Sequence, residues 1–347
     1  MQQQNNRINS FSIWRIVFTF VIIIFHLVNG TDFYSKYPMF QYHWYIAVEF
    51  FFVLSGYLLM QHLENHPEET TWQYTGHRFL RLFPEYFVIC LLRVIIVYGS
   101  EGPVMLLYRI LINWQEFFML QGVGTNIFPY INNPGWYVSS LLICGHLIYY
   151  LLRNHKKAFI EFIGPVIVIV SFSYMYRNYA SLENFYETRD IFMNTGIIRG
   201  MMAMTLGVFA YESAGKIRPL LTKARAAWVF ALEIVLYLFV IVFSILTPET
   251  RHDFLFLFVF FVAVICSGVN SLVIKLCRCR VIMFLDELSY TMYLSHFTVF
   301  CLVGRVYRSD TWEWIQIPIT LVSVILLSVI IHYPVKYLVS GRNKKNG

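Results

Sequence analysis

INSFSIWRIVFTFVIIIFHLVN, residues 8–29, is the stretch of sequence that decides the fold. Its centre, Ile16 to Phe25, carries no charge, and its length matches the roughly 20 apolar residues that a helix needs to cross a bilayer. Arg15 and His26 stand on either side of this centre. Their separation of 11 residues is about three helical turns, so both side chains lie on one face, about 16 Å apart along the axis. Because ionisable groups inside a membrane are costly and usually face a protein interior, the pair predicts an interior polar track through a membrane protein.

Composition places the chain among integral membrane proteins. Of its 347 residues 58% are hydrophobic and only 14% are charged, whereas soluble globular proteins carry about 25% charged residues. The net charge of +7 does not indicate nucleic acid as a partner, because the basic residues lie in short loops between apolar runs, as is typical of membrane topology. We expect the protein to lie in a lipid bilayer.

The hydropathy pattern predicts an all-α polytopic fold in which about ten transmembrane helices form a single bundle with an interior pore. No separate soluble domain is expected, so residues 1–347 form one membrane domain. The predicted spans are 8–29, 44–62, 83–99, 136–152, 158–177, 191–212, 227–247, 254–274, 284–304 and 314–338. Residues 104–121 are apolar but carry Arg109, Gln115 and Glu116, which favours an interfacial or re-entrant helix.

Basic residues set the orientation of these spans. Arg177 and Lys336, at the ends of their spans, are counted with the neighbouring loops. With both termini in the cytoplasm, 17 of the 27 lysines and arginines then fall in stretches predicted to be cytoplasmic, seven in outer stretches and three within spans. Such a bias agrees with the enrichment of Lys and Arg in cytoplasmic loops. The longest loops are then the outer ones, 30–43, 99–135 and 178–190, and the inner loop 63–82.

The carboxyl group of Glu49 is predicted to lie near His26. The first span ends on the outside and the second begins there, so antiparallel neighbours bring both residues to a similar depth. A carboxylate beside an imidazole fixes the tautomer of the ring and raises its basicity, as a general base requires. Each residue alone also suits a structural role as a polar group bonding across helices, and this alternative stays open. We take His26, Glu49 and Arg15 as candidate catalytic residues.

Three arginines are candidates for binding an anionic cofactor. Arg78 and Arg81 lie at the cytoplasmic mouth, three residues apart, so on a helix they project to one side. Guanidinium groups bind phosphate bidentately, although ordinary anchoring by positive inner loops explains the same pair. Arg199 lies within the sixth span beside glycine and other small residues that permit close helix approach, so we expect it to face the bundle interior.

Candidate substrate-binding residues lie at the outer start of the fourth span and within the ninth. They are Asn133, Trp136 and Tyr137, together with His296. Trp136 and Tyr137 also suit a role as interfacial aromatics, and His296 suits that of a satisfied interior histidine. The sequence shows no metal-ligand pattern, nucleotide-binding loop or nucleophile elbow, so no metal is expected.

Five blocks in order along the chain resemble the acyltransferase family 3 membrane proteins. They are Arg15-x10-His26, the run VEFFFVLSGYL at 48–58, RFLRLFP at 78–84, PGWYVS at 134–139 and LSYTMYLSH at 288–296. Two positions depart from the usual family pattern. Glu49 stands where aspartate is common, and Ser295 where tryptophan is often found.

The resemblance implies transfer of an acyl group, usually acetyl from acetyl-CoA, to a hydroxyl of a polysaccharide or related glycan outside the membrane. Acyl-CoA would bind at Arg78 and Arg81 on the inside, and its pantetheine arm would reach towards His26. The histidine would act either as base or as acyl carrier. The family resemblance leaves the acceptor glycan open, and the sequence leaves open the oligomeric state.

Two other classes of protein compete with this interpretation. A secondary transporter also places ionisable residues inside a bundle, but it usually shows internal repeats and broken helices at corresponding positions, which the sequence lacks. A non-catalytic assembly protein for glycan export would not need the aligned Arg15 and His26. Binding or hydrolysis of acetyl-CoA by membranes that contain the protein would distinguish an enzyme from both.

Overall fold

The computed structural model describes residues 10–29, 43–123, 131–183, 194–270, 272, 277–306 and 313–343. Within these ranges the secondary structure is helical, with no strand, which confirms the predicted all-α class. Most of the outer loops 30–43 and 178–190, and residues 124–130 of the loop 99–135, lie outside the described residues.

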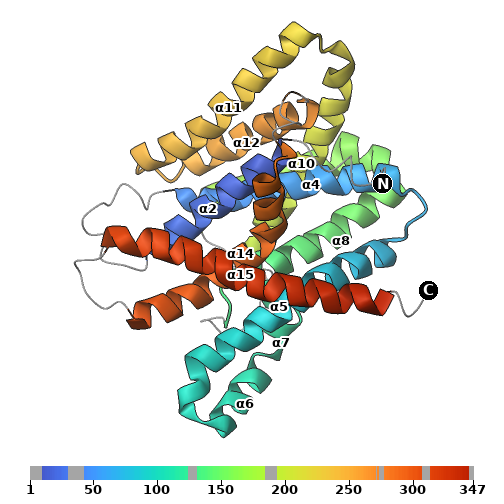
Figure 1. Cartoon of the computed structure of the whole chain (residues 1–347). Helices are drawn as coiled ribbons and strands as arrows, with labels where there is room; N and C mark the ends of the chain where they lie inside the picture. Colours follow the sequence, from blue (N-terminus) through green and yellow to red (C-terminus); the bar gives the residue numbers. More distant parts are fainter. Residues whose placement is uncertain are drawn as a thin grey trace.

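The described residues form ten long helices and several short ones (Figure 1). The long helices are α2 (Phe11–Asn29), α4 (Ala47–Asn65), α5 (Thr71–Tyr98), α8 (Gly135–Ala158), α9 (Gly164–Asn178), α10 (Thr195–Ile217), α11 (Lys223–Leu246), α12 (His252–Val269), α14 (Arg280–Val306) and α15 (Glu313–Asn343). The short ones are η2 (Trp44–Ile46), η3 (Gly99–Glu101), α6 (Pro103–Ile112), α7 (Trp114–Phe117), η4 (Gln121–Val123), the π-helix η5 (Phe159–Ile163) and η6 (Arg218–Leu220).

Six segments among the described residues are long and apolar enough to cross a membrane. They are Phe11–Asn29, Trp44–Asn65, Gly135–Asn178, Arg225–Leu246, His252–Val269 and Ile315–Val339. The third has 44 residues, about twice what one crossing needs. Its backbone leaves helical geometry at His155 (φ −141°, ψ 42°), inside the predicted loop between the fourth and fifth spans. The protein is therefore an all-helical membrane protein, while the count of ten spans stays a prediction.

The other three predicted spans, 83–99, 191–212 and 284–304, correspond to helices α5, α10 and α14, which are long but less apolar. Polar and charged side chains lower their hydropathy, and several of these are buried, among them Arg199 and His296. Buried polar residues in a membrane protein are expected on helices that face the bundle interior rather than lipid. These helices accordingly pack against many others, α10 against α4, α8, α9 and α12.

The structure corrects the boundary of the inner loop predicted at 63–82. Helix α4 continues to Asn65 and α5 already begins at Thr71. A capping box starts α5, because the Thr70 side chain accepts from the Gln73 backbone while the Gln73 side chain accepts from Thr70. The sequence prediction followed the apolar run and missed this polar helical start. The segment 104–121 does not span a membrane, because it consists mainly of α6, with 10 residues, and α7, with four.

Helices α4 and α10 approach each other so closely that their backbones touch. A Cβ atom on Gly56 would lie 1.9 Å from the carbonyl oxygen of Met204, and one on Gly207 would lie 2.0 Å from that of Val53. No side chain fits at either position without moving a helix. Small residues at such crossings are a common means of helix association in membranes.

We predict that Gly56→Ala and Gly207→Ala each destabilise the protein by about 1–3 kcal/mol or more, since an inserted methyl group forces the helices apart. Thermal unfolding of the purified protein in detergent measures the effect. Gly76→Ala in α5 is the matched control, because a Cβ there meets nothing within 4 Å and alanine favours the helix. Equal midpoints for Gly56→Ala and Gly76→Ala would contradict the close crossing.

Candidate functional site

Arg15 and His26 both face α14. The Nη2 atom of Arg15 lies 2.7 Å from Oδ2 of Asp286, and the His26 ring stacks on that of His296 with centroids 5.3 Å apart. Since the partner residues increase in number together, α2 and α14 run parallel and in register. The prediction that Arg15 and His26 share one helix face is confirmed. Parallel packing also agrees with their predicted places as the first and ninth spans.

His26 lines a cavity of about 160 Å³. Its wall comes from the last turns of α2, the first turns of α4, α8 and α10, and the second half of α14. The lining residues are Ile22, Phe25, His26, Asn29, Tyr45, Val48, Asn133, Pro134, Trp136, Glu183, Arg199, Tyr293 and Phe297. All these helix ends belong to the side of the bundle that the sequence predicts to be the outside. The cavity has room for several water molecules or for part of a substrate.

His296 lies behind His26 rather than in the cavity. Its side chain is fully buried, and its Nδ1 atom lies 2.5 Å from the carbonyl oxygen of Tyr293. A carbonyl only accepts, so Nδ1 carries the proton, and the neutral ring has its lone pair on Nε2. Within the described residues Nε2 has no hydrogen-bond partner. The geometry therefore makes His296 a support for the His26 ring, in contrast to its predicted role in direct contact with substrate.

Glu49 pairs with Arg199 and not, as predicted, with His26. Oε1 of Glu49 lies 2.7 Å from Nε and 2.6 Å from Nη2 of Arg199, and both side chains are almost fully buried. The helix crossing explains the difference. Glu49 lies two turns before Gly56, on the face of α4 that touches α10, and Arg199 lies about two turns before Gly207 on the facing side of α10.

Arg199 belongs to the cavity at the outer end of the bundle. It is one of the lining residues, and its guanidinium lies 4.9 Å from the centre of the Trp136 ring. This place does not suit its predicted role in binding the phosphates of a cofactor, because those were assigned to the opposite, cytoplasmic end. The predicted topology already put Arg199 in the outer half of the sixth span, which begins on the outside, so its assignment to the phosphates disagreed with its predicted depth.

The predicted substrate-binding residues at the start of α8 have different surroundings in the structure. Asn133 and Trp136 line the cavity, as predicted for substrate-binding residues. Tyr137 does not, because its ring packs against Phe52 at 4.7 Å and against Tyr293 at 5.5 Å. Residues one position apart on a helix point in different directions, which explains why neighbours in the sequence have different surroundings.

Arg78 and Arg81 lie at the other end of the bundle, in the first turns of α5. Nη1 of Arg78 donates to the hydroxyl of Tyr74 at 2.7 Å, and the Tyr74 ring stacks on Tyr149 with centroids 4.1 Å apart. Arg78 is half-buried, whereas Arg81 is exposed. An anchored guanidinium beside an exposed one suits a ligand that arrives from the aqueous side.

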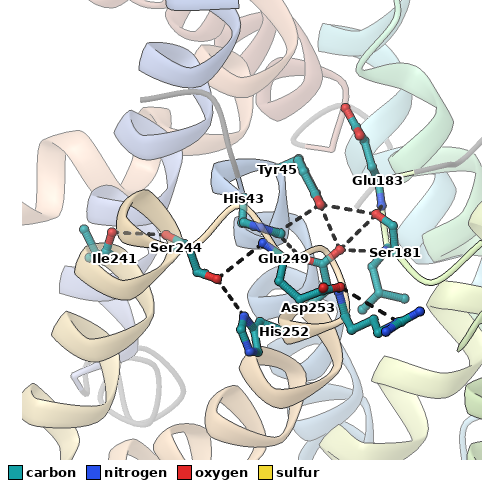
Figure 2. Close-up of polar contacts among 12 residues, drawn as sticks. His43, Tyr45, Ser181, Glu183, Ile241, Ser244, Glu249, His252 and Asp253 are labelled. Carbon is teal, nitrogen blue, oxygen red and sulfur yellow. Dashed lines mark hydrogen bonds and ion pairs between the residues drawn. The ribbon is translucent and has the colours of Figure 1, made fainter. Parts of the chain in front are cut away.

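A buried network around Asp253 was missed by the sequence prediction (Figure 2). The Asp253 carboxylate accepts from Nδ1 of His43 at 2.5 Å and from the hydroxyl of Tyr45 at 2.8 Å. It also accepts from Oγ of Ser181 at 3.0 Å and from the backbone N–H of Leu182 at 2.7 Å. The network ties the start of α12 to residues 181–183 and to the start of α4. The partners are far apart in sequence, so no local spacing signalled them.

Glu183 lines the cavity, and the sequence prediction did not name it, although it lies in the outer loop 178–190 expected to bind the acceptor. Burial and the neighbouring Asp253 carboxylate raise the pKa of Glu183, and Arg199 and His43 act against this shift. The Glu183 side chain and Arg199 thus place opposite charges on one wall of the cavity.

The buried Glu49–Arg199 pair yields a test of the site's architecture. We predict that Glu49→Gln lowers stability by about 3–5 kcal/mol, because it leaves the Arg199 charge buried without its counter-charge. The double variant Glu49→Leu, Arg199→Met removes both charges, so its stability should fall less than that of Glu49→Gln. Thermal unfolding in detergent compares the three proteins, and a Glu49→Gln protein as stable as the unsubstituted one would contradict the pairing.

Comparison with known proteins assigns the family. A family model described as an acyltransferase domain, that of acyltransferase family 3, matches residues 8–333. No curated protein and no solved structure matches the chain. The match begins ahead of α2, extends into α15 and includes every lining residue of the cavity. Because it covers nearly the entire chain, the protein belongs to acyltransferase family 3.

Proposed function

We propose that the protein is a membrane O-acyltransferase that moves an acyl group, in the simplest case acetyl, from cytoplasmic acyl-CoA to a hydroxyl of a glycan outside the membrane. Membership of the family supports acyl transfer. The observation that carries the rest is the parallel pair of α2 and α14, which lines up Arg15 with Asp286 at one end and His26 with His296 at the cavity. This arrangement places an ion pair at one end of the contact between α2 and α14 and a pair of histidine rings at the other.

His26 is the proposed base or acyl carrier. As base, its free ring nitrogen takes the proton of the acceptor hydroxyl, whose oxygen attacks the thioester carbonyl while the CoA sulfur leaves. As acyl carrier, the same nitrogen attacks the thioester carbonyl and the CoA thiolate leaves. The acceptor hydroxyl then attacks the acyl group on the ring, the bond to nitrogen breaks, and the hydroxyl proton passes to the released ring nitrogen. In both routes negative charge develops on the carbonyl oxygen. Arg199 supplies the positive charge that lines the same cavity, and Glu49 holds Arg199 in position.

The donor is proposed to bind at the cytoplasmic end. Arg78 and Arg81 project from the first turns of α5, where they suit the phosphate groups of CoA. Arg15 is only partly buried in its pair with Asp286, and it lies between this end and His26. The slim pantetheine arm would follow this face towards the cavity, while the acceptor enters from the opposite side.

We predict that His26→Ala abolishes acyl transfer without loss of folded protein, because it removes the only imidazole that lines the cavity among the described residues. O-acetylation of surface glycans in cells and turnover of labelled acetyl-CoA in membranes measure the effect. His66→Ala is the control, since His66 is exposed at the opposite end of the bundle. If the His26→Ala variant transfers acyl groups at nearly the rate of the unsubstituted protein, the assignment of His26 is wrong. If the unsubstituted protein turns over no acetyl-CoA, the protein is a transporter or an assembly protein instead.

We predict that Arg78→Ala and Arg81→Ala each weaken acetyl-CoA binding by about tenfold at low salt. The difference from the unsubstituted protein should shrink at high salt, because salt screens the ionic contacts with phosphate. Isothermal titration of the purified protein with CoA gives the affinities. Lys157→Ala is the matched control, because Lys157 is an exposed cation on the same side of the bundle. If both arginine variants bind CoA as tightly as the control, the pair serves only to orient the protein in the membrane.

A further inference from the structure

Glu183 is the carboxylate in the wall of the cavity that contains His26. Among the described lining residues Arg199 also carries a charge, and Glu49 already balances it through a buried ion pair. In its ionised form the Glu183 carboxylate therefore gives this wall a net negative charge. A ligand that enters the cavity from the outside meets this charge beside the proposed base.

The backbone of Glu183 is fixed on both sides. Its N–H group donates to Oγ of Ser181 at 2.9 Å, and its carbonyl oxygen accepts from Nη1 of Arg199 at 3.2 Å. Ser181 and Leu182 are in turn held by the buried Asp253 carboxylate. Figure 2 shows the Glu183 side chain pointing away from Asp253. The network thus holds a carboxylate that the network itself does not use, and a group held in this way binds a ligand with little further ordering.

The rest of the wall has the side chains that bind sugar rings. Trp136, Tyr45 and Tyr293 present aromatic surface, and Asn29 and Asn133 present amides. The Oδ1 atom of Asn133 is buried and has no hydrogen-bond partner within the described residues. Amide and carboxylate oxygens accept hydrogen bonds from hydroxyl or ammonium groups, whereas they repel the carboxylate of an acidic sugar.

We propose that Glu183 binds the acceptor and selects its class, accepting glycans whose sugars are neutral or carry an amine and disfavouring glycans of acidic sugars. This inference rests on the proposed function, since it concerns the acceptor of the same reaction. Glu183 is a specificity residue, while His26 performs the chemistry.

Binding is measured with the full-length protein in detergent and without acyl-CoA, so the result does not depend on transfer. The probes are three oligosaccharides of similar length, from chitosan with amines, from dextran without charge and from polygalacturonate with carboxylates. The unsubstituted protein should bind the first two more tightly than the third. Glu183→Gln should weaken chitosan binding by about five- to tenfold and strengthen polygalacturonate binding. Glu183→Lys should invert the order.

Glu249→Gln is the matched control, because Glu249 lies in the turn before α12 beside the same network (Figure 2) but does not line the cavity. Equal affinities of Glu183→Gln and the unsubstituted protein for all three probes would overturn the proposal. The proposal would also be overturned if the unsubstituted protein bound polygalacturonate most tightly of the three probes, or if it bound none of them. His26→Ala separates the two claims, because it should keep the binding order while losing transfer. If the unsubstituted protein transfers acyl groups but does not bind the three probes in the expected order, only the role of Glu183 is refuted.

Discussion

The ion pair between Glu49 and Arg199 is the interaction on which the outer half of the bundle depends. Two charges buried in a membrane interior are stable only when each balances the other, so α4 and α10 must meet with these residues opposed. The backbone contacts at Gly56 and Gly207, two turns further along, hold the helices at the required distance. Arg199 then reaches the Trp136 ring and the carbonyl oxygen of Glu183. One charge pair thereby joins α4, α8, α10 and the segment before α10 into a single wall.

Helix α14 provides the second organising face. Asp286 of this helix pairs with Arg15, and His296 stacks on His26. Tyr293, which lies between Asp286 and His296 on α14, donates its hydroxyl hydrogen to the carbonyl oxygen of Pro134 just before α8. The His26 ring is supported by the ring of His296 on one side and open to the cavity on the other. A reactive group held by packing while one face stays accessible is the arrangement that positioned chemistry requires.

Sequence alone predicted the helical class, the shared face of Arg15 and His26 and the family, because these follow from periodicity and from order along the chain. It predicted Asn133 and Trp136 in the right place for the same reason. It assigned Glu49 to the wrong partner, because depth in the membrane does not reveal the direction in which a side chain points. Glu183 and the network around Asp253 escaped prediction, since their partners come from four separate segments. The third span was predicted to begin at residue 83, whereas α5 begins at Thr71. The capping box that starts this helix is polar, so a search for apolar residues misses it.

The parallel packing of α2 and α14 has a consequence for how the protein is made. Positions 26 and 296 meet in the finished bundle, yet 269 of the 347 residues lie between them and must be synthesised first. Until α14 enters the membrane, Arg15 has no Asp286 beside it, and α2 carries an unbalanced cation that favours the interface over the bilayer interior. The nascent chain also lacks the ring that supports His26. The supporting ring of His26 and the cavity wall that α14 supplies are therefore completed late in biogenesis, after the ninth long helix of the described residues is in place. A truncated or stalled chain lacks both.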